Sequence, residues 1–93
     1  MNVVPHDSAL VQRHELFWEI SPDRILQALS ENDEWVIVRI FEYGNITDIF
    51  DVIKLYGEDH VRKVLHKEKL KPTATVMAYL FLGVDRYNRY ASH

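Results

Sequence analysis

The sequence predicts an all-α fold: a compact single domain of four to five short helices. Two observations carry this prediction. Segments with helical apolar spacing follow one another between recognisable caps, and only one segment has the residue types of a strand. The chain has 93 residues, of which 47% are hydrophobic, so it can bury one core. With only three Gly and three Pro, its composition excludes a disordered or low-complexity chain.

The N-terminal residues 1–14 show no sustained periodicity, so we expect a flexible lead-in with at most one helical turn at residues 9–13. The helical domain is expected over residues 15–85, followed by a polar and aromatic tail over residues 86–93. The first helix is predicted over residues 22–29, because Ser21 suits an N-cap and Pro22 suits the first helical position. Its apolar stripe consists of Ile25, Leu26 and Leu29.

Residues 35–41 form the one ambiguous segment, because their β-branched and aromatic side chains favour a strand. No second run of this kind is present to pair with it, and a lone strand leaves its backbone polar groups unsatisfied. Asn32 or Asp33 can cap a helix here, and Gly44 stands where a left-handed C-cap belongs. We therefore predict a central, buried helix over residues 33–43.

Three further helices are predicted downstream. Asn45 or Thr47 caps a helix over residues 48–56, and Gly57 ends it. A short helix over residues 58–66 and a basic loop follow, and the last helix extends from Pro72 to Gly83. The predicted core combines both tryptophans with the helix stripes: Trp18, Trp35, Ile37, Ile40, Phe41, Ile53, Leu65, Met77, Leu80 and Phe81.

The two halves of the chain carry opposite charge, although the net charge is only −3. Residues 1–61 have four Lys/Arg and twelve Asp/Glu, whereas residues 62–93 have seven and two. We expect the halves to fold against each other and to screen their charges. There is no Cys and no apolar stretch long enough to cross a bilayer, so we expect a cytoplasmic protein.

The sequence offers no enzymatic chemistry. Its five histidines are scattered, and His60 and His66 would diverge around a helix, so no metal site is expected. Acidic pairs such as Asp48 with Asp51 lie at predicted helix starts, where they stabilise the helix dipole. We therefore predict no catalytic, cofactor-binding or metal-binding residue, and expect that the protein is not an enzyme.

Nucleic-acid binding is the alternative function, through a helix-turn-helix-like arrangement around Gly57 and the basic C-terminal half. Residues 62–71 carry five basic residues and one acidic residue. Against this reading, the expected recognition helix begins with Glu58 and Asp59, which DNA phosphates would repel. The basic and aromatic tail could stack on single strands, or could pack on the domain or on a partner.

A partner-binding surface is predicted where large side chains have no internal use. Tyr and Arg often carry interface energy, and a basic surface fits an acidic groove of a protein partner. If the last helix resumes after Gly83, Tyr87 and Tyr90 share one face; otherwise these tyrosines pack back on Phe17 and Trp18. The predicted partner-binding residues are Lys63, Lys67, Lys69, Arg86, Tyr87, Arg89 and Tyr90.

Four short motifs resemble a small bacterial helical family of unknown function. They are LFWEI at residues 16–20, FEYG at 41–44, LYG at 55–57 and LKP at 70–72, and the likeness covers residues 16–90. The family's corresponding patterns are an FWD opening, an RVLEYG ending and an LSP helix start, so Lys71 here replaces a capping Ser.

Members of that family are often encoded beside a nucleotidyltransferase-like toxin of the abortive-infection type. The resemblance therefore implies an antitoxin or accessory partner of such a toxin, and it provides no catalytic residue. Together with the absence of enzymatic motifs, it favours a non-catalytic protein-binding domain.

Overall fold

The computed structural model describes residues 8–84, which contain helices and no strand. The prediction of an all-α domain is confirmed. Three short 3-10 turns precede five α-helices: η1 (Ala9–Gln12), η2 (His14–Leu16), η3 (Pro22–Arg24), α1 (Ile25–Glu31), α2 (Asp33–Tyr43), α3 (Ile46–Tyr56), α4 (Glu58–Lys67) and α5 (Pro72–Leu82).

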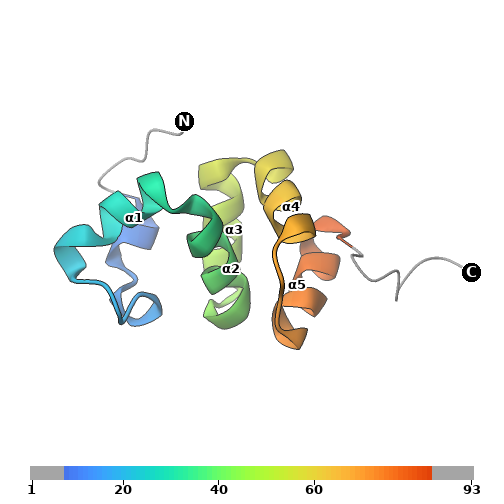
Figure 1. The fold of residues 1–93 in the computed structure, drawn as a ribbon, viewed down its shortest axis with the longest axis horizontal. Coiled ribbons are helices and arrows are strands. Elements are labelled where there is room, and N and C mark those ends of the chain that lie inside the picture. The colour runs from blue at the N-terminus through green and yellow to red at the C-terminus, as the bar shows by residue number, and fades with distance from the viewer. Residues whose placement is uncertain (1–7, 85–93) are drawn as a thin grey trace, which may run out of the picture.

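Helix α2 is the centre of the fold and contacts each of the other four α-helices. The 3-10 turns and α1 lie at one end of the molecule, and α4 and α5 lie at the other (Figure 1). Within α2, Val36, Ile37 and Ile40 are completely buried. Burial on all sides thus outweighs the strand propensity of these residues, and the predicted bounds 33–43 are confirmed.

The start of α3 is fixed by a capping box. The Asn45 side chain accepts a hydrogen bond from the Asp48 backbone N–H at 2.8 Å, and the Asp48 carboxylate accepts one from the Asn45 N–H at 2.9 Å. Asn45 is therefore the cap, and α3 begins at Ile46, two residues before the predicted start. Neither Ser21 nor Asn32 makes a side-chain capping bond.

The prediction of a left-handed cap is wrong at Gly44 and correct at Gly83. Gly44 is extended, with φ −78° and ψ 165°, but a Cβ there would lie 2.7 Å from the Ile40 carbonyl oxygen. Glycine is needed at this position because the chain passes close to α2. Gly83 is left-handed, with φ 68° and ψ 21°, and Val84 after it is buried, as is common after such a cap.

The predicted core is wrong at three positions. Trp18, Trp35 and Leu80 are 60%, 36% and 66% exposed, because the tryptophans lie over an arginine and Leu80 lies on the outer side of α5. The other predicted members belong to the core or pack against it: Ile37, Ile40, Phe41 and Leu65 are buried, and Ile53, Met77 and Phe81 are partly buried.

The segment before residue 15 belongs to the packed structure where it is described. Leu10 is completely buried in the core, and Arg13 pairs with Asp48 of α3, although residues 1–14 were expected to form a flexible lead-in. The predicted turn at residues 9–13 is present as η1. The predicted tail, residues 86–93, lies outside the described residues. No helix within residues 8–84 is long and apolar enough to cross a membrane.

We predict that Leu10→Ala destabilises the protein by about 2–4 kcal/mol, because it deletes a fully buried side chain and leaves a cavity. Gln12→Ala in the same turn changes an exposed residue and is the matched control, for which we expect at most about 0.5 kcal/mol. Urea denaturation measures both. Equal stability of the two variants would show that residues 8–14 are only loosely attached.

Candidate functional site

Arg39 on α2 has a buried side chain that makes several hydrogen bonds. It is only 9% exposed, and both of its terminal nitrogens donate to the Glu19 carboxylate, at 2.7 and 2.8 Å. One of these nitrogens also donates to the Leu16 carbonyl oxygen at 2.9 Å. A buried guanidinium needs such partners, and the bidentate geometry provides them.

Aromatic rings surround the same guanidinium. Its central carbon lies 4.3 Å from the ring centroid of Trp18, 4.6 Å from that of Trp35 and 5.7 Å from that of Tyr43. This geometry is a cation–π arrangement, and it explains why both tryptophans remain partly exposed. We call Trp18, Glu19, Trp35, Arg39 and Tyr43 the Arg39 cluster.

The electrostatics of the Arg39 cluster favour the charged forms of both partners. The hydrogen bond from Arg39 lowers the pKa of Glu19, and the bond to Glu19 raises the pKa of Arg39. Nearby, Lys71 donates to the Tyr43 hydroxyl, which raises the pKa of Lys71. Arg39 is already bound to groups of its own chain, so we interpret the cluster as an anchor for residues 16–19.

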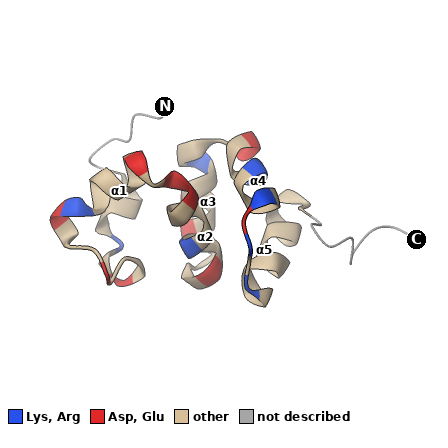
Figure 2. Cartoon of the chain, in the orientation of Figure 1, with Lys and Arg blue, Asp and Glu red and all other residues tan. Residues whose placement is uncertain are grey.

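A pocket of about 850 Å³ opens beside Trp35, between the end of α1, the start of α2 and the segment after α4. Figure 2 shows acidic residues on all three of these segments. The lining contains no Lys or Arg, and we call it the acidic groove: Ile20, Glu31, Asn32, Asp33, Glu34, Trp35, Val38 and Glu68.

The four carboxylates of the acidic groove have different partners. Glu34 pairs with the Lys67 ammonium at 2.6 Å, and Asp33 contacts the His60 ring. Glu31 accepts only a neutral hydrogen bond, from Gln27 at 3.2 Å. The Glu68 carboxylate makes neither a hydrogen bond nor an ion pair with any residue in the range 8–84, although its charge contributes to the raised pKa of the adjacent Lys67. Two carboxylates of the groove thus make no ion pair in this part of the chain.

A second surface is apolar. On α3, Ile46 and Phe50 are 55% and 59% exposed, and on α5, Val76 and Leu80 are 41% and 66% exposed. Phe50 connects the two helices through an edge-to-face contact with Phe81, with ring centroids 5.4 Å apart. We call Ile46, Phe50, Val76 and Leu80 the α3–α5 face.

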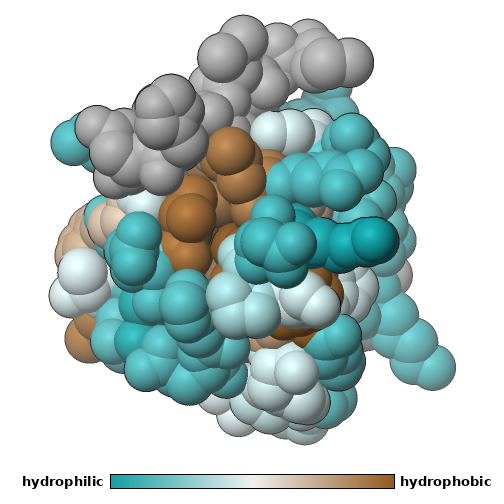
Figure 3. Space-filling model, turned by 90° about the vertical axis from the view of Figure 1, so that its left-hand side faces the viewer, coloured by the Kyte–Doolittle hydropathy of each residue, from teal (hydrophilic) through white to brown (hydrophobic). Residues whose placement is uncertain are grey.

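The α3–α5 face follows from the composition of α5, which has no charged residue between Pro72 and Leu82. A helix that is apolar on all sides is normally buried on all sides, so its uncovered outer side is unusual. In contrast, the end of the molecule that carries α1 is mostly hydrophilic, with apolar residues in its middle and at one edge (Figure 3).

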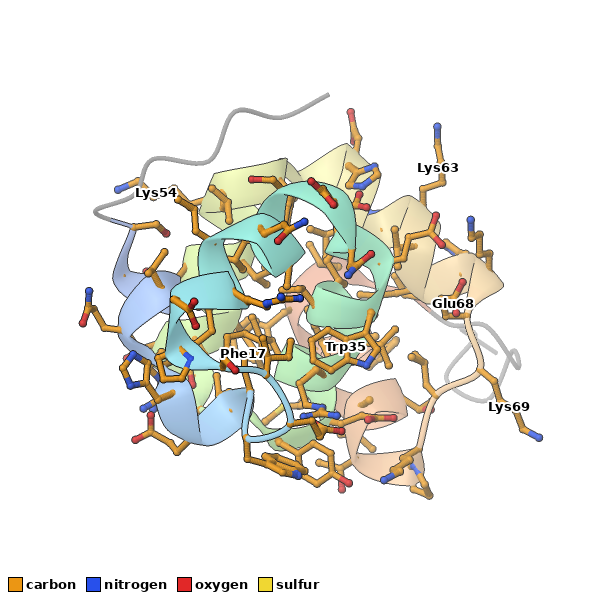
Figure 4. All side chains as sticks on the ribbon, turned by 60° about the vertical axis from the view of Figure 1, so that its left-hand side comes forward. Phe17, Trp35, Lys54, Lys63, Glu68 and Lys69 are labelled. Atoms are coloured by element: carbon orange, nitrogen blue, oxygen red, sulfur yellow. The ribbon has the colours of Figure 1, made fainter. Side chains whose placement is uncertain are left out.

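The predicted partner-binding lysines do not form one continuous surface. Lys63 and Lys69 are exposed and point away from the body of the molecule (Figure 4). Lys67 between them is paired with Glu34, which raises its pKa. The other predicted residues, Arg86, Tyr87, Arg89 and Tyr90, lie outside the described part of the chain.

The sequence analysis missed both the acidic groove and the α3–α5 face. A signal for the groove was present in Glu31, Asp33 and Glu34, three acidic residues at one helix junction. Its remaining acidic residue, Glu68, comes from a distant segment and could not be assigned to it. For the α3–α5 face, the signal was the missing polar side of the last helix. Among residues 8–84, no group of three or more potential metal ligands was found.

Comparison with known proteins gives one match. The model of a family of unknown function, DUF6922, matches residues 12–65, which is more than half of the chain. The match contains both pairs that tie the N-terminal turns to the helices: Glu19 with Arg39 and Arg13 with Asp48. No curated protein and no solved structure matches the chain.

We predict that Glu19→Gln lowers stability at neutral pH and that this difference shrinks in acid. Because Arg39 lowers the pKa of Glu19, the folded state keeps this carboxylate ionised at a lower pH than the unfolded chain, whose Glu pKa is about 4.3. The stabilisation is therefore complete above about pH 5 and is lost as the pH falls through the folded-state pKa. Urea denaturation at neutral pH and at about pH 3 measures the difference.

Asp23→Asn is the control for this prediction, because Asp23 is exposed and makes no ion pair with the described residues. We expect it to stay within about 0.5 kcal/mol of the unmodified protein at neutral pH. A Glu19→Gln effect that is the same at both pH values would mean that the carboxylate charge does not hold the N-terminal turns.

Proposed function

Because this chain belongs to DUF6922, a family of unknown function, its role has to be argued from its surfaces, and we propose a non-catalytic protein-binding domain. The observation that carries the proposal is the α3–α5 face. Its four side chains are all more than 40% exposed, although they are aliphatic or aromatic. Groups of exposed apolar side chains often mark interaction sites in small proteins.

The energetics of the α3–α5 face suit a protein partner. Complete burial of a Val, Leu, Ile or Phe side chain contributes about 1.5–3 kcal/mol, so a complementary surface gains from covering these residues. The face contains no acid, base or nucleophile, so packing is the only interaction that its own side chains offer. It also lies on two helices, which keep it preorganised for binding.

We propose a nucleotidyltransferase-like toxin of the abortive-infection type as the partner, with this protein as its antitoxin or accessory subunit in the cytoplasm. The support for this partner is the motif resemblance described above.

Co-expression of this protein with the toxin encoded beside it tests the proposal. We expect a complex that survives affinity purification, relief of toxicity, and at least about tenfold weaker binding for Leu80→Gln, which removes the most exposed apolar side chain of the face. Lys63→Gln is the matched control because it also places an exposed glutamine on a helix. We expect its affinity to stay within about twofold of the original.

The outcomes separate the two candidate surfaces. Weakening by Lys63→Gln and Lys69→Gln, but not by Leu80→Gln, would move the interface to the predicted basic residues. Absence of a complex between the folded proteins would refute the proposed partner.

Nucleic-acid binding is kept as the alternative function because Lys63 and Lys69 are exposed. Arg62 is not free for a phosphate, since it donates to Glu58, Asp59 and the Leu82 carbonyl oxygen. We predict no stable complex with single-stranded RNA or duplex DNA in gel shifts at about 150 mM salt. Salt-sensitive binding that Lys69→Gln weakens would support the alternative.

A further inference from the structure

We infer that the acidic groove is a second protein-binding site, which takes a basic segment carrying Lys or Arg next to an apolar side chain. The groove is separate from the α3–α5 face and shares no residue with it. The inference therefore does not depend on the proposed function.

The groove combines two chemical features that a basic segment needs. Ile20, Trp35 and Val38 supply apolar surface in its lining, and the carboxylates supply negative charge beside that surface. Lys and Arg side chains have an apolar stem and a charged end, so they can contact both features at once. An acidic segment would be repelled, and a purely apolar one would leave the carboxylates without a partner.

The charge balance of the groove indicates how many cations it can take. Lys67 already neutralises Glu34, and the His60 ring already contacts Asp33. Glu31 and Glu68 make no ion pair within residues 8–84, and no Lys or Arg lines the groove. The charge of Glu68 does act on Lys67, but the Lys67 ammonium is bonded to Glu34. Two basic side chains, one for each of these carboxylates, would complete the pairing.

Lys67 shows that an ammonium group fits the rim of this groove. Its Nζ lies 2.6 Å from Glu34 Oε2, in direct contact with one of the lining carboxylates. Lys69, close by in the sequence, is exposed, and its side chain points away from the molecule (Figure 4). Neither lysine makes an ion pair with Glu68, so this carboxylate can still accept a bond from an external cation.

Trp35 provides a spectroscopic signal that reports binding in the groove. Its ring lies against Arg39 on α2 and 6.0 Å from the ring of Phe17, so its position is fixed, and it is 36% exposed. Trp18 is the only other tryptophan in the chain and does not line the groove. The two indole N–H signals in an NMR spectrum thus provide a reporter and an internal control.

The test is an NMR titration of the full chain with the peptide Ac-Arg-Leu-Arg-NH₂, using Ac-Glu-Leu-Glu-NH₂ as the control peptide. We expect the basic peptide to shift the Trp35 indole signal more than the Trp18 signal, with weaker binding at higher salt. The acidic peptide should shift neither signal.

Substitution of the two free carboxylates tests their role. We expect the double variant Glu31→Gln and Glu68→Gln to weaken binding of the basic peptide at least about fivefold, because both cation partners are lost. Glu42→Gln is the matched control: it removes an acidic side chain from α2 that does not line the groove and has no ion pair in the described chain. Its affinity should stay within about twofold.

Three results would overturn the inference: no Trp35 shift up to about 5 mM peptide, equal response to both peptides, or unchanged binding by the double variant. Leu80→Gln distinguishes this site from the α3–α5 face. If it abolishes the toxin complex and leaves peptide binding intact, both sites exist, whereas intact peptide binding without any toxin complex refutes only the proposed function.

Discussion

The buried charge of Arg39 is the constraint on which the N-terminal third of the structure depends. A guanidinium that is 9% exposed on the central helix needs hydrogen-bond acceptors and a counter-ion. Both come from the stretch between the end of η2 and the start of η3: the carbonyl of Leu16, the last residue of η2, and the Glu19 carboxylate. Satisfying one side chain on α2 therefore fixes the path of a segment that has no regular helix of its own.

A second ion pair fixes the same segment with the charges reversed. Arg13 donates to both carboxylate oxygens of Asp48, at 2.7 and 2.8 Å, and the hydrogen bond raises the pKa of Arg13. Asp48 is also the third residue of α3 and closes its capping box with Asn45. The start of α3 and the N-terminal turns are thus held by one carboxylate, which accepts three hydrogen bonds that would be lost if it were removed.

The helices could be predicted because their signals are local. Pro22 and Pro72 mark helix starts, Gly57 and Gly83 lie at helix ends, and apolar spacing gives the buried sides. The central helix could be assigned despite its strand-like composition, because no partner strand was available. Its predicted bounds are those observed.

The errors arise where contacts join residues far apart in sequence. Hydrophobicity places Trp18 and Trp35 in the core, but both rings cover a guanidinium whose position depends on a pairing across 20 residues. The basic residues around Lys67 predicted a binding surface there, but Lys67 is paired with Glu34, 33 residues away. Pairings of this kind decide which side chains remain available for binding at the surface, and no local sequence pattern predicts them.

The central helix also separates the two candidate surfaces. The acidic groove includes Asp33 and Glu34 at the start of α2, whereas the α3–α5 face begins at Ile46, just after α2 ends. With 11 residues at a rise of 1.5 Å each, α2 places its two ends about 16 Å apart. Because the two surfaces share no residue, we expect substitutions in them to contribute additively to free energy.

Additivity has a consequence for binding. A ligand in the groove would contact Trp35. Arg39 and Phe17 pack against this ring from the inner side, so the ring is already positioned before the ligand binds. An occupant of the α3–α5 face would contact helices whose inner sides are packed against the core. Neither event requires α2 to move, so a partner that covers both surfaces would gain the sum of two preorganised contacts, and two separate partners would bind without competing.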